Sequence, residues 1–172
     1  ALLGTVLLVW SMILSTRLRF IENIYNGLDK VYHVHIKTGK WGFFLILIHP
    51  LALALEHTDK MIDWFLPFHH NPQMNFGVIS FWIFVYLVVA ALFFKELKIP
   101  YHIWKIMHKT INVAMFFALL HILLIKSDTS SFLPLGILIY SLVIIGVLSG
   151  LYKLLLYKKL SPHFTYIIKS IT

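Results

Sequence analysis

The sequence has no cysteine and few charged residues. Of its 172 residues, 13% are charged and 59% are hydrophobic, whereas a soluble domain carries charge on roughly a quarter of its residues. A chain of this composition is an integral membrane protein. The lack of cysteine excludes disulfide scaffolds, zinc–thiolate sites and iron–sulfur clusters.

Acidic residues are missing from the apolar runs of the chain. Five such runs can be drawn, at residues 2–16, 39–55, 76–94, 103–125 and 135–156, and none contains Asp or Glu. Their lengths suit tilted membrane-spanning helices, so the predicted fold is an all-α membrane helix bundle. Proton and divalent-cation transporters are expected to place acidic residues at membrane depth. The absence of acidic residues from these runs counts against a role in ion transport.

Positive charges gather on one side of the expected spans. Of the 15 lysine and arginine residues, all but Lys60 and Lys126 lie near the loops after the first and third spans or at the C-terminus. By the positive-inside rule this side is cytoplasmic, in a multi-pass protein of the cell membrane whose C-terminus is cytoplasmic. An external N-terminus without a signal sequence predicts one more span upstream, six in all. Positive residues in short loops between spans indicate membrane topology and not nucleic-acid binding. The expected partner is therefore the lipid bilayer, and no nucleic acid is expected.

Histidines recur at similar intervals in two of these segments. His35 and His49 lie 14 positions apart, a rotation of ~1400° on a helix, only ~40° short of four turns, and an axial distance of ~21 Å. His108 and His121 lie 13 apart, or ~19.5 Å. Both distances fit within the ~30 Å hydrocarbon core. The charge pattern places the first histidine of each pair near the cytoplasm and the second near the exterior, so the inner rings can face each other, as can the outer rings.

These four histidines are candidate axial ligands of two stacked metal macrocycles. A single histidine in an apolar helix is more often a packed, hydrogen-bonded side chain, but ionisable residues in spans are rare and tend to be functional. Neutral imidazole suits an iron porphyrin. One difficulty is that 13 residues turn ~1300°, ~140° away from a common face. His108 and His121 therefore need a π-bulge, wide packing or an approach from different flanks.

Other residues are weaker candidates. His33 and His102 begin cytoplasmic helices, but at intervals that fit less well. The remaining histidines are expected to be solvated: His57, His69, His70 and His163. Small or polar residues that could admit a macrocycle, or simply pack helices, are Gly39, Gly42 and Asn112. Residues that could bridge the two histidine levels, or belong to the core, are Met115, Phe116 and Phe117. Basic residues that could pair with propionates, or only set topology, are Arg17, Arg19, Lys37 and Lys109.

The segments HIKTGKWGFFLILIH and HKTINVAMFFALLH resemble the NADPH oxidase and ferric reductase transmembrane family. The segments LDKVYHVH, GLYKLLLYKKLS and IWKIMHK look most like bacterial NADPH oxidases. The resemblance implies a haem domain over residues 1–157 that holds two b-type haems. It further implies that residues 158–172, where β-formers dominate after Pro162, are a linker and the start of a cytoplasmic FAD-binding domain.

The same resemblance implies ligands and a reaction. His35 and His108 would ligate the inner haem iron, and His49 and His121 the outer haem iron. Electrons would pass from cytoplasmic NAD(P)H through FAD, on a fused dehydrogenase module, and through both haems to external oxygen, giving superoxide. The chain would then be the membrane haem part of an NAD(P)H oxidase, an oxidoreductase, with residues 57–75 folded over the outer mouth.

Three alternatives stay open. A ferric-chelate reductase would use the same haem conduit with ferric iron as the acceptor, and the sequence departs from some eukaryotic oxidases at Leu53 and Ala114, where they carry a histidine and an aromatic residue. A quinol-linked di-haem cytochrome b subunit would take electrons from a lipid quinone. A histidine-rich metal transporter or structural subunit would hold no haem.

Overall fold

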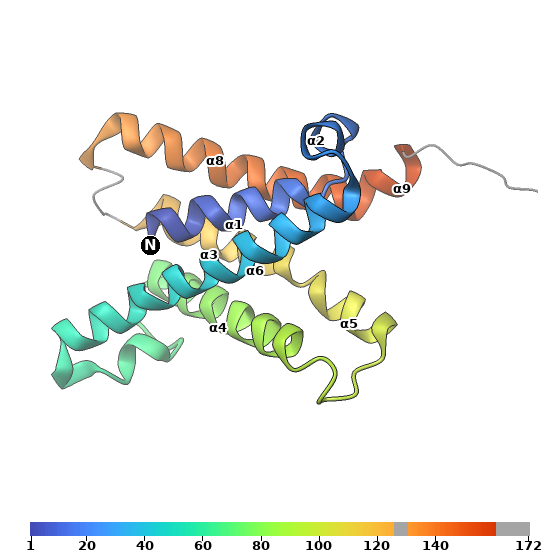
Figure 1. The fold of residues 1–172 in the computed structure, drawn as a ribbon. Helices are drawn as coiled ribbons and strands as arrows, with labels where there is room; N and C mark the ends of the chain where they lie inside the picture. Colours follow the sequence, from blue (N-terminus) through green and yellow to red (C-terminus); the bar gives the residue numbers. More distant parts are fainter. Residues whose placement is uncertain (126–130, 161–172) are drawn as a thin grey trace, which may run out of the picture.

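The computed structural model describes residues 1–125 and 131–160, and every regular element in these ranges is helical, as predicted (Figure 1). The β-prone segment after Pro162 lies outside the described residues. The helices are α1 (Leu2–Leu14), α2 (Arg19–Tyr25), α3 (Leu28–Glu56), η1 (Thr58–Lys60), η2 (Asp63–Phe65), α4 (Pro72–Leu92), α5 (Tyr101–His108), α6 (Ile111–Leu124), α8 (Leu133–Leu151), η3 (Tyr152–Leu156) and α9 (Tyr157–Leu160).

Four helical segments are long and apolar enough to cross a membrane, or five if the bent pair of α1 and α2 counts as one span. The four are Leu28–Glu56, Pro72–Leu92, Tyr101–Leu124 and Leu133–Leu160. After α1 the chain turns by 108° into α2, and Arg17 adopts a φ of 59° at this turn. The first predicted run therefore forms a shorter helix than expected, followed by a short helix that lies across it.

Helix α3 begins 11 residues before the apolar run that predicted it. Hydropathy marks only the lipid-facing length of a helix, whereas residues 28–38 contain no proline or glycine that would stop helix formation. Asp29 in the first turn also interacts favourably with the helix dipole. The early start matters for function because it places His35 well inside a regular helix. The prediction that Pro134 opens the last long helix is confirmed, since this proline lies in the first turn of α8.

Helix α1 lies at the centre of one half of the bundle and packs against α3 and α8. Glycines let α1 and α3 approach closely: a Cβ on Gly4 would lie 2.9 Å from the Gly42 carbonyl oxygen, and a Cβ on Gly42 would lie 3.0 Å from Leu8 Cδ2. The core around this contact contains Leu8, Val9, Met12, Phe43, Phe84, Ala114, Met115, Ile139 and Val143. Of the two predicted roles for Gly42, helix packing is the one observed.

The other half of the bundle is formed by α4 and α6, which pack along each other, and α6 also contacts α8. In contrast, α3 and α6 share almost no direct contact. Helix α3 carries His35 and His49, α5 ends at His108, and α6 carries His121. The bundle therefore brings the histidine-bearing helices to the same interior region without packing one directly on the other.

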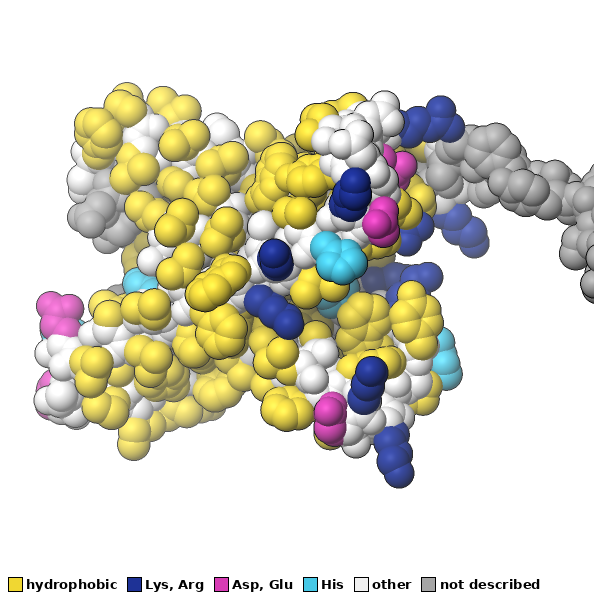
Figure 2. Space-filling model, in the orientation of Figure 1, with side chains coloured by type: hydrophobic (Ala, Val, Ile, Leu, Met, Phe, Trp, Pro, Cys, Tyr) yellow, Lys and Arg dark blue, Asp and Glu magenta, His cyan; other side chains and the backbone are white. Residues whose placement is uncertain are grey.

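The two ends of the bundle differ in charge (Figure 2). Lysine and arginine side chains gather at the end that holds α2, the start of α3, α5 and α9, which we call the basic end. The opposite end, which we call the far end, holds the C-terminus of α3 and the connection to α4, including Glu56, Asp59 and Asp63. The charge separation predicted from the loops is thus a separation in space.

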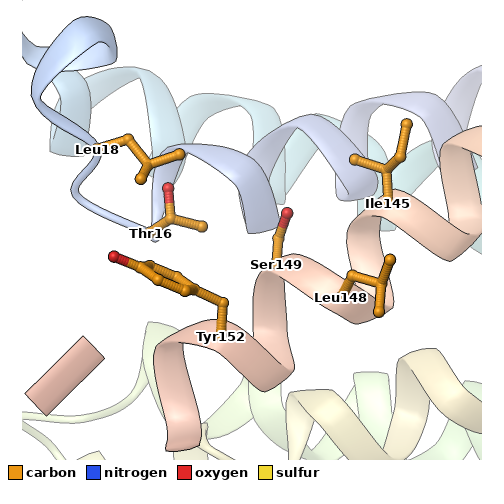
Figure 3. A pocket seen from close by; sticks show the side chains of 6 residues that line it. All are labelled: Thr16, Leu18, Ile145, Leu148, Ser149 and Tyr152. Atoms are coloured by element: carbon orange, nitrogen blue, oxygen red, sulfur yellow. The ribbon is translucent and has the colours of Figure 1, made fainter. Parts of the chain in front are cut away.

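One shallow hollow lies between the α1–α2 turn and α8, near the basic end (Figure 3). It is lined by Thr16, Leu18, Ile145, Leu148, Ser149 and Tyr152. The lining is mostly apolar and includes none of the candidate ligands. The hollow is therefore separate from the site described next.

Candidate functional site

His35 is fixed by α1. Its Nδ1 donates a hydrogen bond to the Ser11 carbonyl oxygen at 2.9 Å and lies 2.8 Å from Ser11 Oγ, while Ser11 Oγ donates to the His35 carbonyl at 3.1 Å. A carbonyl oxygen can only accept, so this contact places the proton on Nδ1. The lone pair then lies on Nε2, as in most metal-bound histidines whose other nitrogen is held by a second group.

His108 faces His35 from the end of α5. The two ring centroids are 6.2 Å apart and the ring planes are almost perpendicular, at 84°. A metal ion lies about 2 Å from an imidazole nitrogen, so two rings that share one ion have centroids about 6 Å apart. The separation at the basic end therefore fits a single metal held between the two rings.

A local change in helix geometry brings His108 to this position. Between α5 and α6 the backbone makes i→i−3 hydrogen bonds, from Lys109 N to Ile106 O, Thr110 N to Met107 O, Asn112 N to Lys109 O and Val113 N to Thr110 O. Such bonds tighten the helix to 3.0 residues per turn, so each residue adds more rotation than in an α-helix. The 13 residues from His108 to His121 turn less than four full turns on an α-helix, and the extra rotation reduces this shortfall. The π-bulge offered as an explanation is not found here, and the π-helical turn lies instead at Tyr152–Leu156.

The second pair lies toward the far end. His121 on α6 donates Nδ1–H to the Gln73 carbonyl oxygen on α4 at 2.7 Å, which again leaves Nε2 with the lone pair. Gly77, one turn further along α4, lies against the ring, where an added Cβ would be 2.7 Å from His121 Nδ1. His49 lies on α3 and His121 on α6, and no hydrogen bond or ring contact joins them among the described residues. The structure thus fixes the ring of His121, and its pairing with His49 stays a prediction.

The competing histidines do not enter the bundle. His33 and His102 are exposed at the basic end, and His33 Nδ1 bonds the Asp29 carbonyl of its own helix at 3.0 Å. His57 and His70 are exposed at the far end, as predicted. His163 lies outside the described residues. Position in the fold therefore separates the four candidate ligands from these histidines.

The prediction of a solvated ring is wrong for His69, which belongs to an aromatic cluster over the far end. The ring of Trp64 stacks on His57 at 5.6 Å and lies 6.1 Å from His69. His69 is anchored by Asn75, which accepts from its backbone N–H at 2.8 Å and donates to its carbonyl at 2.9 Å. Trp64 Nε1 and His69 Nε2 are both buried without a hydrogen-bond partner. The spacing of polar residues in residues 57–75 does not predict this cluster, because its side chains meet only when the loop folds.

The residues considered as a bridge between the pairs separate in the structure. Met115 is only 2% exposed and belongs to the central core, Phe117 stacks on Phe76 of α4 at 5.9 Å, and Phe116 is exposed. Gly39 faces Ser11, with an added Cβ 3.3 Å from its Oγ. Met115 and Gly39 thus have packing roles.

The basic residues considered as propionate partners are also distinguished by their contacts. Arg17 Nε donates to the Tyr32 hydroxyl, and its guanidinium lies 6.0 Å from the Tyr157 ring, over which Lys153 Nζ sits at 3.5 Å. Arg19, Lys37 and Lys109 are exposed. Asn112 Oδ1 is buried without a partner and lies beside Gly150.

The histidine side chains offer the kind of axial nitrogen that a macrocyclic metal requires from a protein. No group of three or more His, Cys, Asp or Glu side chains that could hold an ion occurs in residues 1–125 and 131–160. A haem iron receives four nitrogens from its own macrocycle and needs only axial ligands from the protein. The facing rings of His35 and His108 fit that requirement, and Nδ1 is fixed by a backbone carbonyl on both His35 and His121.

Comparison with known proteins identifies a membrane redox family. The model of the ferric reductase like transmembrane component matches residues 1–119. The matched region contains His35, His49 and His108 and ends two residues before His121. No curated protein matches the chain.

Proposed function

The chain belongs to the ferric reductase-like transmembrane component family, and on this premise we propose that it is the membrane haem part of an NAD(P)H oxidase. Membership of the family identifies a membrane oxidoreductase component that transfers electrons across the bilayer. The nature of the cofactors, of the electron donor and of the acceptor is our proposal. The observation that carries it is the facing of His35 and His108 at 6.2 Å.

Each histidine pair would hold one haem b, His35 with His108 at the basic end and His49 with His121 toward the far end. When bound, the two haems supply one-electron redox chemistry that no amino-acid side chain of this chain offers. His35 and His108 would hold one haem iron and His49 and His121 the other, and the apolar side chains around them would limit access of water. With two histidines on each iron, an external acceptor would not be expected to bind the iron directly.

The basic end is proposed to face the cytoplasm of a cell membrane, by the positive-inside rule. The chain continues from this end through α9, with Lys158 and Lys159, toward residues 161–172. A fused dehydrogenase module that binds FAD and NAD(P)H would therefore deliver electrons on the side of His35 and His108. Residues 158–172 would be the linker and the first part of that module.

Oxygen is the proposed acceptor, at the far end, with superoxide as product. The buried and unpartnered Trp64 Nε1–H supports an anionic product there, because an unpaired donor in a water-poor site stabilises negative charge. A ferric chelate is the second candidate, since the same donor suits its negative charge. Steady-state rates of the full-length protein with oxygen and with a ferric chelate, each supplied alone, distinguish the two.

The first experiment is a count of haems per chain by pyridine haemochrome, together with a reduced-minus-oxidised spectrum of the purified full-length protein. We expect two b-type haems, reduced by NADPH. Two haems reduced by a quinol but not by NADPH would favour the quinol-linked cytochrome b subunit. No haem after expression with added haem precursor would overturn the proposal and favour the transporter or structural subunit.

A further inference from the structure

The four candidate ligands are oriented in different ways. His35 and His121 each have Nδ1 fixed by a backbone carbonyl oxygen. His108 has no hydrogen bond to either ring nitrogen in the described part of the chain. Its ring instead lies on the indole of Trp104, with centroids 5.0 Å apart and planes only 12° from parallel. This is the shortest ring separation among the aromatic contacts of the described residues.

Trp104 is itself held by two further aromatic rings. The ring of Tyr101 stacks on Trp104 at 5.9 Å and 22°, and the ring of Phe94 meets Trp104 edge-on at 5.9 Å. Tyr101 and Trp104 lie on the same helix as His108, at intervals of three and four residues, so the helix geometry itself aligns the three rings. The indole is therefore a fixed surface and not a side chain free to change rotamer.

We propose that Trp104 is a positioning residue that sets the plane of the His108 imidazole by stacking, in place of the hydrogen bond that orients most ligating histidines. This inference rests on the proposed function, because it assigns Trp104 a role toward the haem held by His35 and His108. Trp104 fixes one ring and Ser11 fixes the other. Together they hold the two planes at the observed 84°.

The angle between two axial imidazoles has a direct spectroscopic consequence. In low-spin ferric haem, parallel imidazole planes separate the energies of the two iron orbitals that share the unpaired electron, whereas perpendicular planes leave them nearly equal. Nearly equal energies give an electron paramagnetic resonance signal with one very large g value, and separated energies give a three-feature rhombic signal. The basic-end haem should give the large-g signal, and loss of the stacking should change it.

The experiment compares Trp104→Leu and Trp104→Phe in the full-length haem-loaded protein by electron paramagnetic resonance and haem count. Leu removes the planar surface, so we expect the large-g signal of one haem to move toward the rhombic form, or that haem alone to be lost. Phe retains a flat ring and should largely restore the wild-type signal. The signal of the second haem serves as an internal reference. Trp41→Leu is a matched control, because this tryptophan is 64% exposed and contacts Phe44 instead of a candidate ligand.

The outcomes separate this inference from the proposed function. A wild-type protein without haem overturns the proposed function itself. Two haems in wild type with signals unchanged in Trp104→Leu would overturn the positioning role alone. If the Leu variant does not accumulate as folded protein, Trp104→Met decides, because its thioether chain fills apolar space without a planar face. An unchanged large-g signal in the Met variant would contradict the proposal, and a shifted signal would support it.

Discussion

At the basic end, His35 and His108 face each other with centroids 6.2 Å apart, whereas His49 and His121 at the far end make no ring contact. The basic-end rings are held by two kinds of contact: His35 Nδ1 donates a hydrogen bond to the Ser11 carbonyl oxygen, and the His108 ring stacks on Trp104. At the far end only His121 is held, by Gln73. Both rings of the first pair are therefore held by neighbouring groups, whereas in the second pair only the His121 ring is held among the described residues.

The surroundings of the two pairs differ as well. The basic end is rich in lysine and arginine, while the far end carries acids and the cluster of His57, Trp64 and His69. Preorganisation lowers the cost of binding, because ordered side chains lose little further freedom. The comparison teaches that the basic-end rings have more contacts that fix them, and that polar atoms without partners, Trp64 Nε1 and His69 Nε2, are buried in the far-end cluster.

Removal of one ligand from each pair should give the largest effect and the clearest separation of the two ends. In full-length protein, His35→Leu and His121→Leu should each lower the haem content from two to about one. Acceptor reduction should fall by at least about a hundredfold, the upper range for damage to a metal site. The remaining haem should still be reduced by NADPH in His121→Leu but not in His35→Leu, as stopped-flow absorbance would show. Full retained activity in either variant would refute the ligand assignment.

Gly77→Ala should selectively damage the far-end pair. The added Cβ would lie 2.7 Å from His121 Nδ1 and 2.8 Å from Cε1, so the ring must move and lose its bond to Gln73. We expect haem affinity at this site to fall by about tenfold to a hundredfold, measured by haem titration of each site.

The matched control is Gly146→Ala, whose Cβ would meet the side chains of Val9 at 3.1 Å and Met115 at 3.3 Å instead of a candidate ligand or its partner. It should leave both sites nearly unchanged. Equal loss in the two variants would show that helix stability, and not ring displacement, explains the result.

Trp64→Phe and His69→Ala should test the polar groups of the far end. Trp64→Phe removes a buried, unpartnered indole N–H and His69→Ala removes a buried, unpartnered ring nitrogen, and neither residue is a candidate ligand. If these groups stabilise the product anion, the rate of oxygen reduction should fall by about tenfold, or ~1.4 kcal/mol, with both haems retained. Superoxide production measured with cytochrome c gives this rate. An unchanged rate would leave the cluster with a structural role, and Tyr86→Phe, on the exposed surface of α4, controls for general effects.

Ser11→Ala should give the smallest effect. The change removes Oγ but keeps the Ser11 carbonyl oxygen, which still accepts from His35 Nδ1 at 2.9 Å. We expect haem affinity at the basic end to fall by less than about tenfold, again by haem titration. A loss as large as that in His35→Leu would mean that the hydroxyl, and not the carbonyl, holds the ring.

The sequence by itself determined the helical membrane class, the charge asymmetry and the four candidate ligands. Composition, acid-free runs and repeated histidine intervals are local properties of the sequence. The spacing of two residues on a helix determines whether they share a face, whatever the other helices do. The bounds of α3 and the tightened turn after His108 were less predictable, because hydropathy does not report hydrogen-bond pattern.

Only the tertiary structure decided what holds each ring. Ser11, Gln73 and Gly77 come from helices remote in sequence from the histidines they contact, and nothing in a linear pattern pairs them. Trp104 lies one turn from His108, but its stacking depends on side-chain direction as well as spacing. Contacts between distant segments follow from the packing of whole helices. The two histidine pairs have similar sequence intervals, and the difference in the contacts that hold their rings therefore arises only when the bundle is assembled.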